Sequence, residues 1–249
     1  MTDDHLVFVD TGRAAEAREP IHRRKLSHEV LDRLLSRLRT GEYPVGSCLP
    51  SERELMQMFA VGRPAVREAL QALERMGFVS IVHGEGARVQ ALSADRLMAQ
   101  LSDPAMHLLS NSELLLEHLK EARLSFELLM VRQAADKASP EDIAVLRSAM
   151  AEQRASVDDP MRFLQADMAF HRAIAGISRN TVFMAVSRAM LEWLEHFHKD
   201  AVTDPGAERG VVAEHEQVLE CIAAHDPEGA ATALANHLNR ANDRYRLGA

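Results

Sequence analysis

Residues 49–89 read LPSERELMQMFAVGRPAVREALQALERMGFVSIVHGEGARV, and this stretch decides the fold of the N-terminal part of the chain. Ser51, followed three residues later by Glu54, has the spacing of a helix-capping box. Gly62 ends this first helical pattern, and Pro64 opens a second one at a position where its missing N–H is not needed. An alternating strand, a turn rich in glycine and a short return strand follow. Together these elements predict a winged helix-turn-helix.

Arginines stand where a helix that reads DNA needs them. Arg63 and Arg67 lie one turn apart at the start of the second helix, the part of a recognition helix that enters the major groove. Bidentate arginine–guanine pairing is the commonest specific contact there. Arg53 on the preceding helix can reach a phosphate or the same groove, and Gly84, beside His83, lets the wing backbone approach the duplex. A merely solvated charged face is the alternative, but it leaves the capping box, helix break and hairpin unexplained.

Charge is distributed unevenly along the chain. The net charge of the whole chain is −8, yet residues 22–90 hold 11 Lys or Arg against 8 Asp or Glu. Residues 91–249 hold 16 basic and 24 acidic residues, so the acidic excess lies outside the predicted DNA-binding domain. Residues 1–24 lack hydrophobic periodicity and predict a flexible acidic tail.

The length of 249 residues is sufficient for two domains. We expect a winged domain over residues 25–90, a linker and hinge over 91–96, and a second domain over 97–246. Ser27 is expected to cap the first helix of the winged domain. Two distant cysteines, no signal-peptide pattern and no long apolar run predict a cytoplasmic protein without membrane contact.

The same motifs resemble a known family. Leu-Pro-Ser-Glu-Arg-Glu-Leu, Val-Gly-Arg-Pro-Ala-Val-Arg-Glu-Ala-Leu and the His-Gly wing are similar to the GntR family of bacterial transcription regulators. The resemblance implies double-stranded operator DNA as the partner. It places the family's DNA-contacting positions on Arg53, Arg63, Arg67, His83 and Gly84. Members of the family often carry hydroxyl residues on either side of the arginine that corresponds to Arg63, where this chain has Gly62 and Pro64. This difference bears on which bases the helix prefers.

Beyond Ala91 the sequence indicates helices only. Apolar residues recur with helical spacing, and Pro104 and several Pro, Asp and Asn residues mark breaks. The predicted helices span residues 94–109, 111–137, 140–157, 160–176, 181–199, 208–225 and 227–245. Such a series predicts an antiparallel all-helical bundle, and the whole chain is therefore expected to be mainly α.

Four residues of this bundle form a candidate metal site. Asp167 and His171 are four residues apart and project from one face of one helix, while His215 and His237 lie on two later helices. One carboxylate and three neutral imidazoles can bind a single divalent ion. Four such ligands leave two positions of an octahedron open, whereas a tetrahedral zinc site would be closed. The plain alternative is that these residues are ordinary among the 12 histidines of the chain.

A second resemblance supports the metal interpretation. The run DMAFHRAI, residues 167–174, followed by Ser178-Arg179-Asn180, is similar to the FCD ligand-binding domain of the FadR branch of GntR regulators. This resemblance implies one divalent metal per chain on Asp167, His171, His215 and His237, with Zn first and Ni, Mn, Co or Fe as alternatives. It also implies a small organic-acid effector and places a pocket arginine at Arg123. The alternative for Arg123 is an ion pair with Glu127 within the same helix.

The stretches Arg-Lys-Leu-Ser, Gly-Glu-Gly-Ala-Arg-Val, Val-Phe-Met-Ala-Val and Leu-Glu-Trp-Leu belong to a narrower resemblance that covers most of residues 25–240. It is to the sialic-acid catabolism repressor subgroup of this family and implies a sugar acid as inducer. The sequence thus predicts a homodimeric repressor of a catabolic operon, controlled by a small carboxylate bound beside a divalent metal. One alternative is a regulator with a purely structural metal and no acid effector. Another is a metal-dependent hydrolase. We predict no enzyme, because no general base or nucleophile is evident beside the site.

Overall fold

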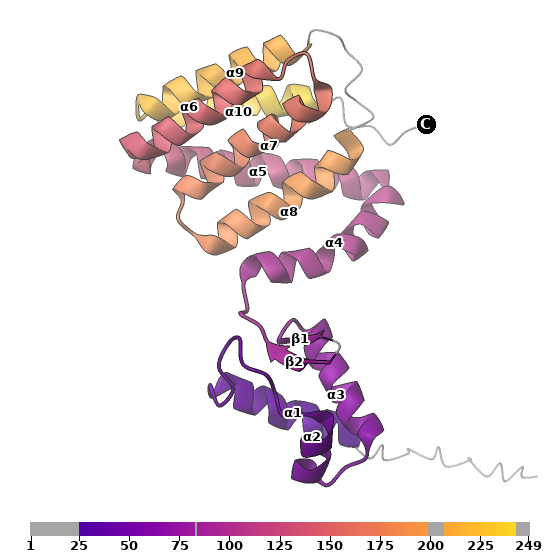
Figure 1. Cartoon of the computed structure of the whole chain (residues 1–249). Coiled ribbons are helices and arrows are strands. Elements are labelled where there is room, and N and C mark those ends of the chain that lie inside the picture. The colour runs from indigo at the N-terminus through magenta and orange to yellow at the C-terminus, as the bar shows by residue number, and fades with distance from the viewer. Residues whose placement is uncertain (1–24, 83, 199–206, 243–249) are drawn as a thin grey trace, which may run out of the picture. The chain divides into compact units, whose positions relative to one another are not determined.

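The computed structural model describes residues 25–82, 84–198 and 207–242. It separates the chain into two compact units, Met1–Ala91 and Leu92–Ala249, whose helices and strands are labelled in Figure 1. Each unit has its own apolar core. The predicted tail over residues 1–24 lies outside the described residues. Within the described ranges, no helix has both the length and the apolar character that spanning a bilayer requires.

The first unit is a winged helix-turn-helix. Its elements are α1 (Leu26–Arg39), α2 (Glu52–Phe59), α3 (Arg63–Arg75), β1 (Val79–Val82) and β2 (Gly86–Val89). The two strands are antiparallel, with Val79 opposite Val89. Side chains from the three helices and the wing form one core, in which Leu34, Leu55 and Leu73 are fully buried. This core fixes α3 against the rest of the domain.

The turn between α2 and α3 is built as the sequence predicts. The Ser51 hydroxyl accepts a hydrogen bond from the Glu54 N–H, and the Glu54 carboxylate accepts one from the Ser51 N–H at 2.8 Å. Ala60 then ends α2 in a left-handed conformation with φ 53°, and Gly62 occupies the N-cap position of α3. The predicted capping box, break and second helix are confirmed.

The start of α1 differs from the prediction. The helix begins at Leu26 with Lys25 at the N-cap position, and no side chain caps it. Ser27 lies inside the helix and is buried. Ser27, Val30 and Leu34 follow one another at helical spacing on the core side, so this serine is a small residue of the packed face rather than a cap.

The second unit is an all-helical bundle, as predicted. Its helices are α4 (Ala94–Ser110), α5 (Glu113–Lys137), α6 (Pro140–Ala155), α7 (Pro160–Ile177), α8 (Thr181–His198), α9 (Ala207–Ala223) and α10 (Pro227–Asn242). Helix α5 packs against α7, α9 and α10, and α6 packs against α7 and α9 (Figure 1). The main core of this unit includes the fully buried Leu146, Phe170 and Leu234. Polar groups that α5, α6, α7, α9 and α10 direct inward therefore meet in its interior.

The segment between the two units is partly helical. Ser93 caps α4 through a hydrogen bond from the Arg96 N–H, so residues 94–96 of the expected linker form the first turn of α4. Pro104 lies inside α4 and does not end it, contrary to the expected break. Packing of α4 against α8 outweighs the single backbone hydrogen bond that a proline removes.

Candidate metal centre and nucleic-acid interface

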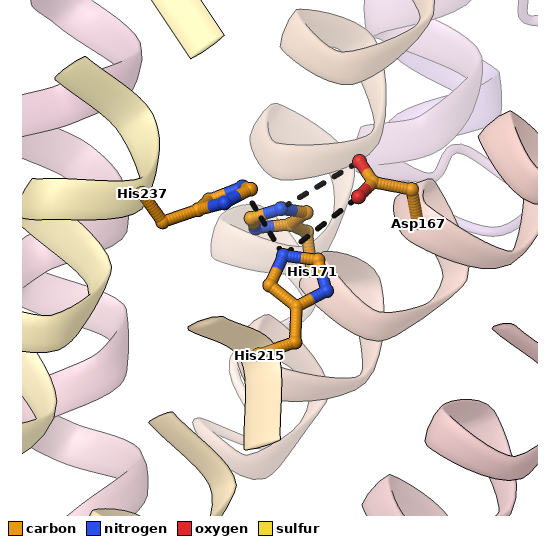
Figure 2. Close-up of side chains that lie close together, drawn as sticks. All are labelled: Asp167, His171, His215 and His237. Carbon is orange, nitrogen blue, oxygen red and sulfur yellow. Dashed lines mark hydrogen bonds and ion pairs between the residues drawn. The ribbon is translucent and has the colours of Figure 1, made fainter. Parts of the chain in front are cut away.

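The four predicted metal ligands come together in the interior of the bundle. Asp167 and His171 project from the same face of α7, His215 comes from α9 and His237 from α10. One donor atom of each residue lies within 4.8 Å of the others, and Figure 2 shows the four side chains converging on one point. The three histidines are buried. The structure thus brings Asp167 and His171 together with the other two predicted ligands in one cluster.

The donor atoms of this cluster lie at separations that suit binding to one shared ion. The Nε2 atoms of His215 and His237 lie 3.1 Å apart. The two carboxylate oxygens of Asp167 lie 3.8 Å from His171 Nε2 and 3.7 Å from His215 Nε2. The Nε2 atom of His171 is buried and has no hydrogen-bond partner among the described residues. A buried polar atom left without a partner is costly, and a metal ion would satisfy it.

Each histidine is oriented by an acceptor at its other ring nitrogen. The Nδ1 atom of His171 lies 2.5 Å from a carboxylate oxygen of Glu127, and Nδ1 of His237 lies 2.9 Å from one of Glu214. Carboxylates accept hydrogen bonds, so both Nδ1 atoms carry the proton. Their Nε2 lone pairs consequently face the centre of the cluster. In metal sites, a hydrogen bond at the other ring nitrogen usually orients a histidine in this way.

Gln153 orients the third histidine and the carboxylate together. Its amide Nε2 donates to Asp167 Oδ1 at 3.0 Å, and its Oε1 lies 2.9 Å from His215 Nδ1. Because Asp167 only accepts, the amide nitrogen must face it, and the amide oxygen must then accept from His215. Gln153 is fully buried. One side chain therefore fixes the tautomer of His215 and occupies one of the two Asp167 oxygens.

Electrostatics keep the cluster ready for a cation. Burial, followed by repulsion from neighbouring positive groups, lowers the pKa of His215 well below its usual value. Burial also lowers the pKa of His237, although its hydrogen bond to Glu214 acts in the opposite direction. Burial alone would raise the pKa of the Glu127 carboxyl, but the charges of Arg123 and His171 hold it well below its usual value. Burial thus favours the neutral form of His215 and His237, and the carboxylates of Glu127 and Glu214 beside the cluster are ionised.

The orienting residues Glu127, Gln153 and Glu214 were not predicted as part of the site. Glu127 was considered only as the helical partner of Arg123, a pair that the structure contains at 2.5 Å with both residues buried. Gln153 carries no sequence signal, because its partners lie on other helices. Glu214 precedes His215 and diverges from it on α9, yet it reaches His237 on the adjacent α10.

Replacing Gln153 by Leu is expected to lower metal affinity about 10- to 100-fold, the usual effect of losing an orienting partner of a metal ligand. The substitution removes the hydrogen bonds to His215 and Asp167 but keeps a side chain of similar size. Competition against a chelating dye measures the change. Gln133→Leu, at a half-buried position of α5, is the control. Equal affinities in the wild type and Gln153→Leu would contradict the orienting role.

The other interface lies on the winged domain. Arg63 and Arg67 are exposed in the first turns of α3, as predicted, and Arg53 is exposed on α2. Gly84 lies in the turn between β1 and β2 with φ 85°, and a side chain there would meet no atom within 4 Å. His83 lies outside the described residues. The structure thus brings the arginines to one helix–turn–helix and leaves the wing tip sterically open.

Comparison with known proteins decides the family. The family described as "Bacterial regulatory proteins, gntR family" matches residues 26–89, and the family described as "FCD domain" matches residues 118–240. HTH-type transcriptional repressor NanR of Edwardsiella tarda is 42% identical over 225 residues, covering 89% of this chain and 86% of that protein. NanR of Escherichia coli K12 is 42% identical over 223 residues, covering 88% and 84%. The chain belongs to the GntR family.

As a GntR-family member with an FCD domain, the chain is a DNA-binding transcription regulator, and the similar proteins are named as repressors rather than enzymes. A solved structure, Streptococcus agalactiae GntR, aligns with a TM-score of 0.61 and 23% identity, covering 87% of this chain and 99% of that one. That likeness supports the fold alone. The GntR-family assignment and the mainly helical two-part architecture predicted from the sequence are both confirmed.

Proposed function

We propose that this regulator represses a catabolic operon and that a small carboxylate effector releases it from operator DNA. The relatives named as NanR repressors support repression. Arg53, Arg63, Arg67, His83 and Gly84 would contact the duplex. A homodimer in the cytoplasm would present two recognition helices, which suits a palindromic operator with half-sites about one helical turn apart.

We infer that Asp167, His171, His215 and His237 hold one divalent ion per chain, Zn in the first place and Ni, Mn, Co or Fe as alternatives. The donor types suit these metals, and the buried Nε2 of His171 lacks another partner in the described part of the chain. A bound divalent ion supplies positive charge and coordination positions for an anionic oxygen. The chain's own residues orient the donors and exclude bulk water.

The observation that carries the effector proposal is the charge balance around the cluster. The Glu127 carboxylate is paired with Arg123 at 2.5 Å, and the Glu214 carboxylate with Arg240 at 2.6 Å. The negative charges of these two carboxylates are therefore already balanced by the two arginines. Of the two positive charges of a divalent ion, Asp167 offsets one. A buried net charge is costly, so a ligand with one carboxylate is favoured over a neutral one.

A sialic acid or another sugar acid fits this requirement, with Arg123 as its second anchor. Arg123 is buried on α5, where its Nε donates to Glu127, and its planar guanidinium has the shape that pairs with a carboxylate. Effector binding releases DNA only if the effector prefers the arrangement that cannot bind the operator. A coupling of about 1–3 kcal/mol is typical of such regulators. The hinge is proposed at residues 91–96.

Arg123→Lys is expected to weaken effector binding about tenfold or more while metal content stays unchanged. Lysine keeps the charge but lacks the planar fork that pairs with a carboxylate. We would load the protein with Zn²⁺ and measure melting temperature against N-acetylneuraminate, glucuronate and glucose. Ligand present at about 100 times its Kd adds about 2.7 kcal/mol to the stability. Arg132→Lys, on the exposed part of the same helix, is the control.

A mobility-shift assay with operator DNA completes this test. Release of the operator by an acid, and not by glucose, is the expected result. If no acid shifts the melting temperature or the operator complex, while chelation lowers the melting temperature, the metal is purely structural and the effector proposal fails. If the metal-loaded protein turns over an acid, the hydrolase alternative replaces it.

A further inference from the structure

One carboxylate on the winged domain binds both arginines of the recognition helix. Glu52, the first residue of α2, accepts from Arg63 Nε at 2.7 Å with one oxygen and from Arg67 Nε at 2.9 Å with the other. The arginine side chains remain 65% and 61% exposed, while Glu52 is 29% exposed. Glu52, Arg67 and the wing residue Gly86 line one hollow between the helices and the wing. The carboxylate thus lies within the surface that would face DNA.

Stability does not explain this arrangement. Exposed ion pairs contribute little to folding, because water competes and two long side chains lose freedom. A carboxylate beside a phosphate backbone also repels it, which lowers general affinity for DNA. The hydrogen bonds from Arg63 and Arg67 lower the pKa of Glu52, so the repelling charge persists at neutral pH.

The geometry of the hydrogen bonds indicates what the arrangement gains. Glu52 uses only the Nε–H of each guanidinium. The two terminal Nη groups form the edge that pairs end-on with the acceptors of guanine. Holding Nε therefore keeps two long side chains extended at a fixed spacing without using that edge. It also offsets the mutual repulsion of two cations one turn apart.

We propose that Glu52 is a specificity-determining residue: it positions Arg63 and Arg67 for base edges and withholds them from phosphates of unrelated DNA. Glu52 thereby raises the ratio of the affinity for the operator to the affinity for random DNA. This inference rests on the proposed placement of Arg63 and Arg67 at the DNA. The competing explanation is a generic charge effect, in which any lost acidic residue of the domain would act alike.

Three variants separate these explanations. Glu52→Gln removes the charge. Glu52→Asp keeps the charge but is one methylene shorter and cannot span both arginines. Glu42→Gln removes an equal charge from another ion pair of the domain, with Arg37 at 3.1 Å, and is the matched control. Melting temperatures show whether each variant is folded, and the aspartate variant keeps the test valid if the glutamine variant is not.

The probes are a random-sequence 24-base-pair duplex and an operator selected with the wild-type protein, both titrated by fluorescence anisotropy at several salt concentrations. We expect Glu52→Gln and Glu52→Asp to bind the random duplex several-fold more tightly. The salt dependence of log K should steepen by about 1–2 because one or two further phosphates are neutralised. The operator-to-random ratio should fall about tenfold, while Glu42→Gln keeps the wild-type ratio.

Three results would overturn the proposal. If Glu52→Asp behaves as wild type and Glu52→Gln matches Glu42→Gln, the effect is generic charge. If both Glu52 variants lose operator and random affinity in the same proportion, the role is structural. Arg63→Ala and Arg67→Ala serve as reference: if neither affects operator binding, the placement of the DNA surface itself is wrong, and the inference falls with it.

Discussion

Alanine at both Arg63 and Arg67 is expected to abolish measurable operator binding while leaving metal content unchanged. A bidentate arginine–guanine pair is worth about 1–3 kcal/mol of discrimination, so two of them amount to roughly 2–6 kcal/mol. That loss corresponds to a fall in operator affinity between about 30-fold and more than 10⁴-fold. Both side chains are exposed, so the fold should tolerate the change.

The measurement is anisotropy or mobility shift on the selected operator, with circular dichroism to follow folding. Arg75→Ala is the matched control, because it removes an exposed arginine from the last turn of the same helix, α3. We expect that variant to bind within a few-fold of wild type. Operator affinity retained in the double variant, or lost equally in Arg75→Ala, would move the DNA surface away from the start of α3.

His171→Ala combined with His215→Ala is expected to reduce metal content from about one ion per chain to almost none. The pair contributes two of the four donors, and the ligands that remain, Asp167 and His237, come from different helices. Structural metal sites of this ligand number contribute on the order of 10 kcal/mol of binding free energy, so half a site holds little metal at micromolar concentration. Mass spectrometry of protein purified without chelator measures the content.

The double variant also leaves the Glu127 carboxylate without one of its two partners, so it is less stable for a second reason. Asp167→Asn avoids this difficulty: it keeps the shape and the amide hydrogen bond from Gln153 but removes the anionic donor. His118→Ala, an exposed histidine of α5, is the control. Equal metal content in all four proteins would mean that the cluster is an ordinary buried polar network.

Local patterns predicted the fold well. The capping box of α2, the proline at the start of α3 and the glycine-rich wing each depend on residues a few positions apart, so the sequence alone reveals them. Errors arose where tertiary packing decides. Ser27 has the chemistry of a cap but belongs to a packed face, and Pro104 has the chemistry of a break but lies in a helix held by α8.

The cluster of candidate metal ligands could be predicted because Asp167 and His171 share a helix face and the family resemblance supplied the other two. Their partners could not be predicted. Gln153 and Glu214 act across helix interfaces, and nothing in their local sequence distinguishes them from solvated polar residues. Glu52 was likewise not predicted to have a role, because its contacts to Arg63 and Arg67 arise from the turn geometry between α2 and α3.

The buried polar cluster draws on α5, α6, α7, α9 and α10, through Glu127, Gln153, His171, Glu214 and His237. It therefore acts as a non-covalent cross-link among five helices of the bundle. Helix α7 packs on α8, α8 packs on α4, and α4 follows the wing strand β2 after only four residues. A ligand that moves these side chains acts through only two helix contacts, α7 with α8 and α8 with α4, on the first helix after the DNA-binding domain.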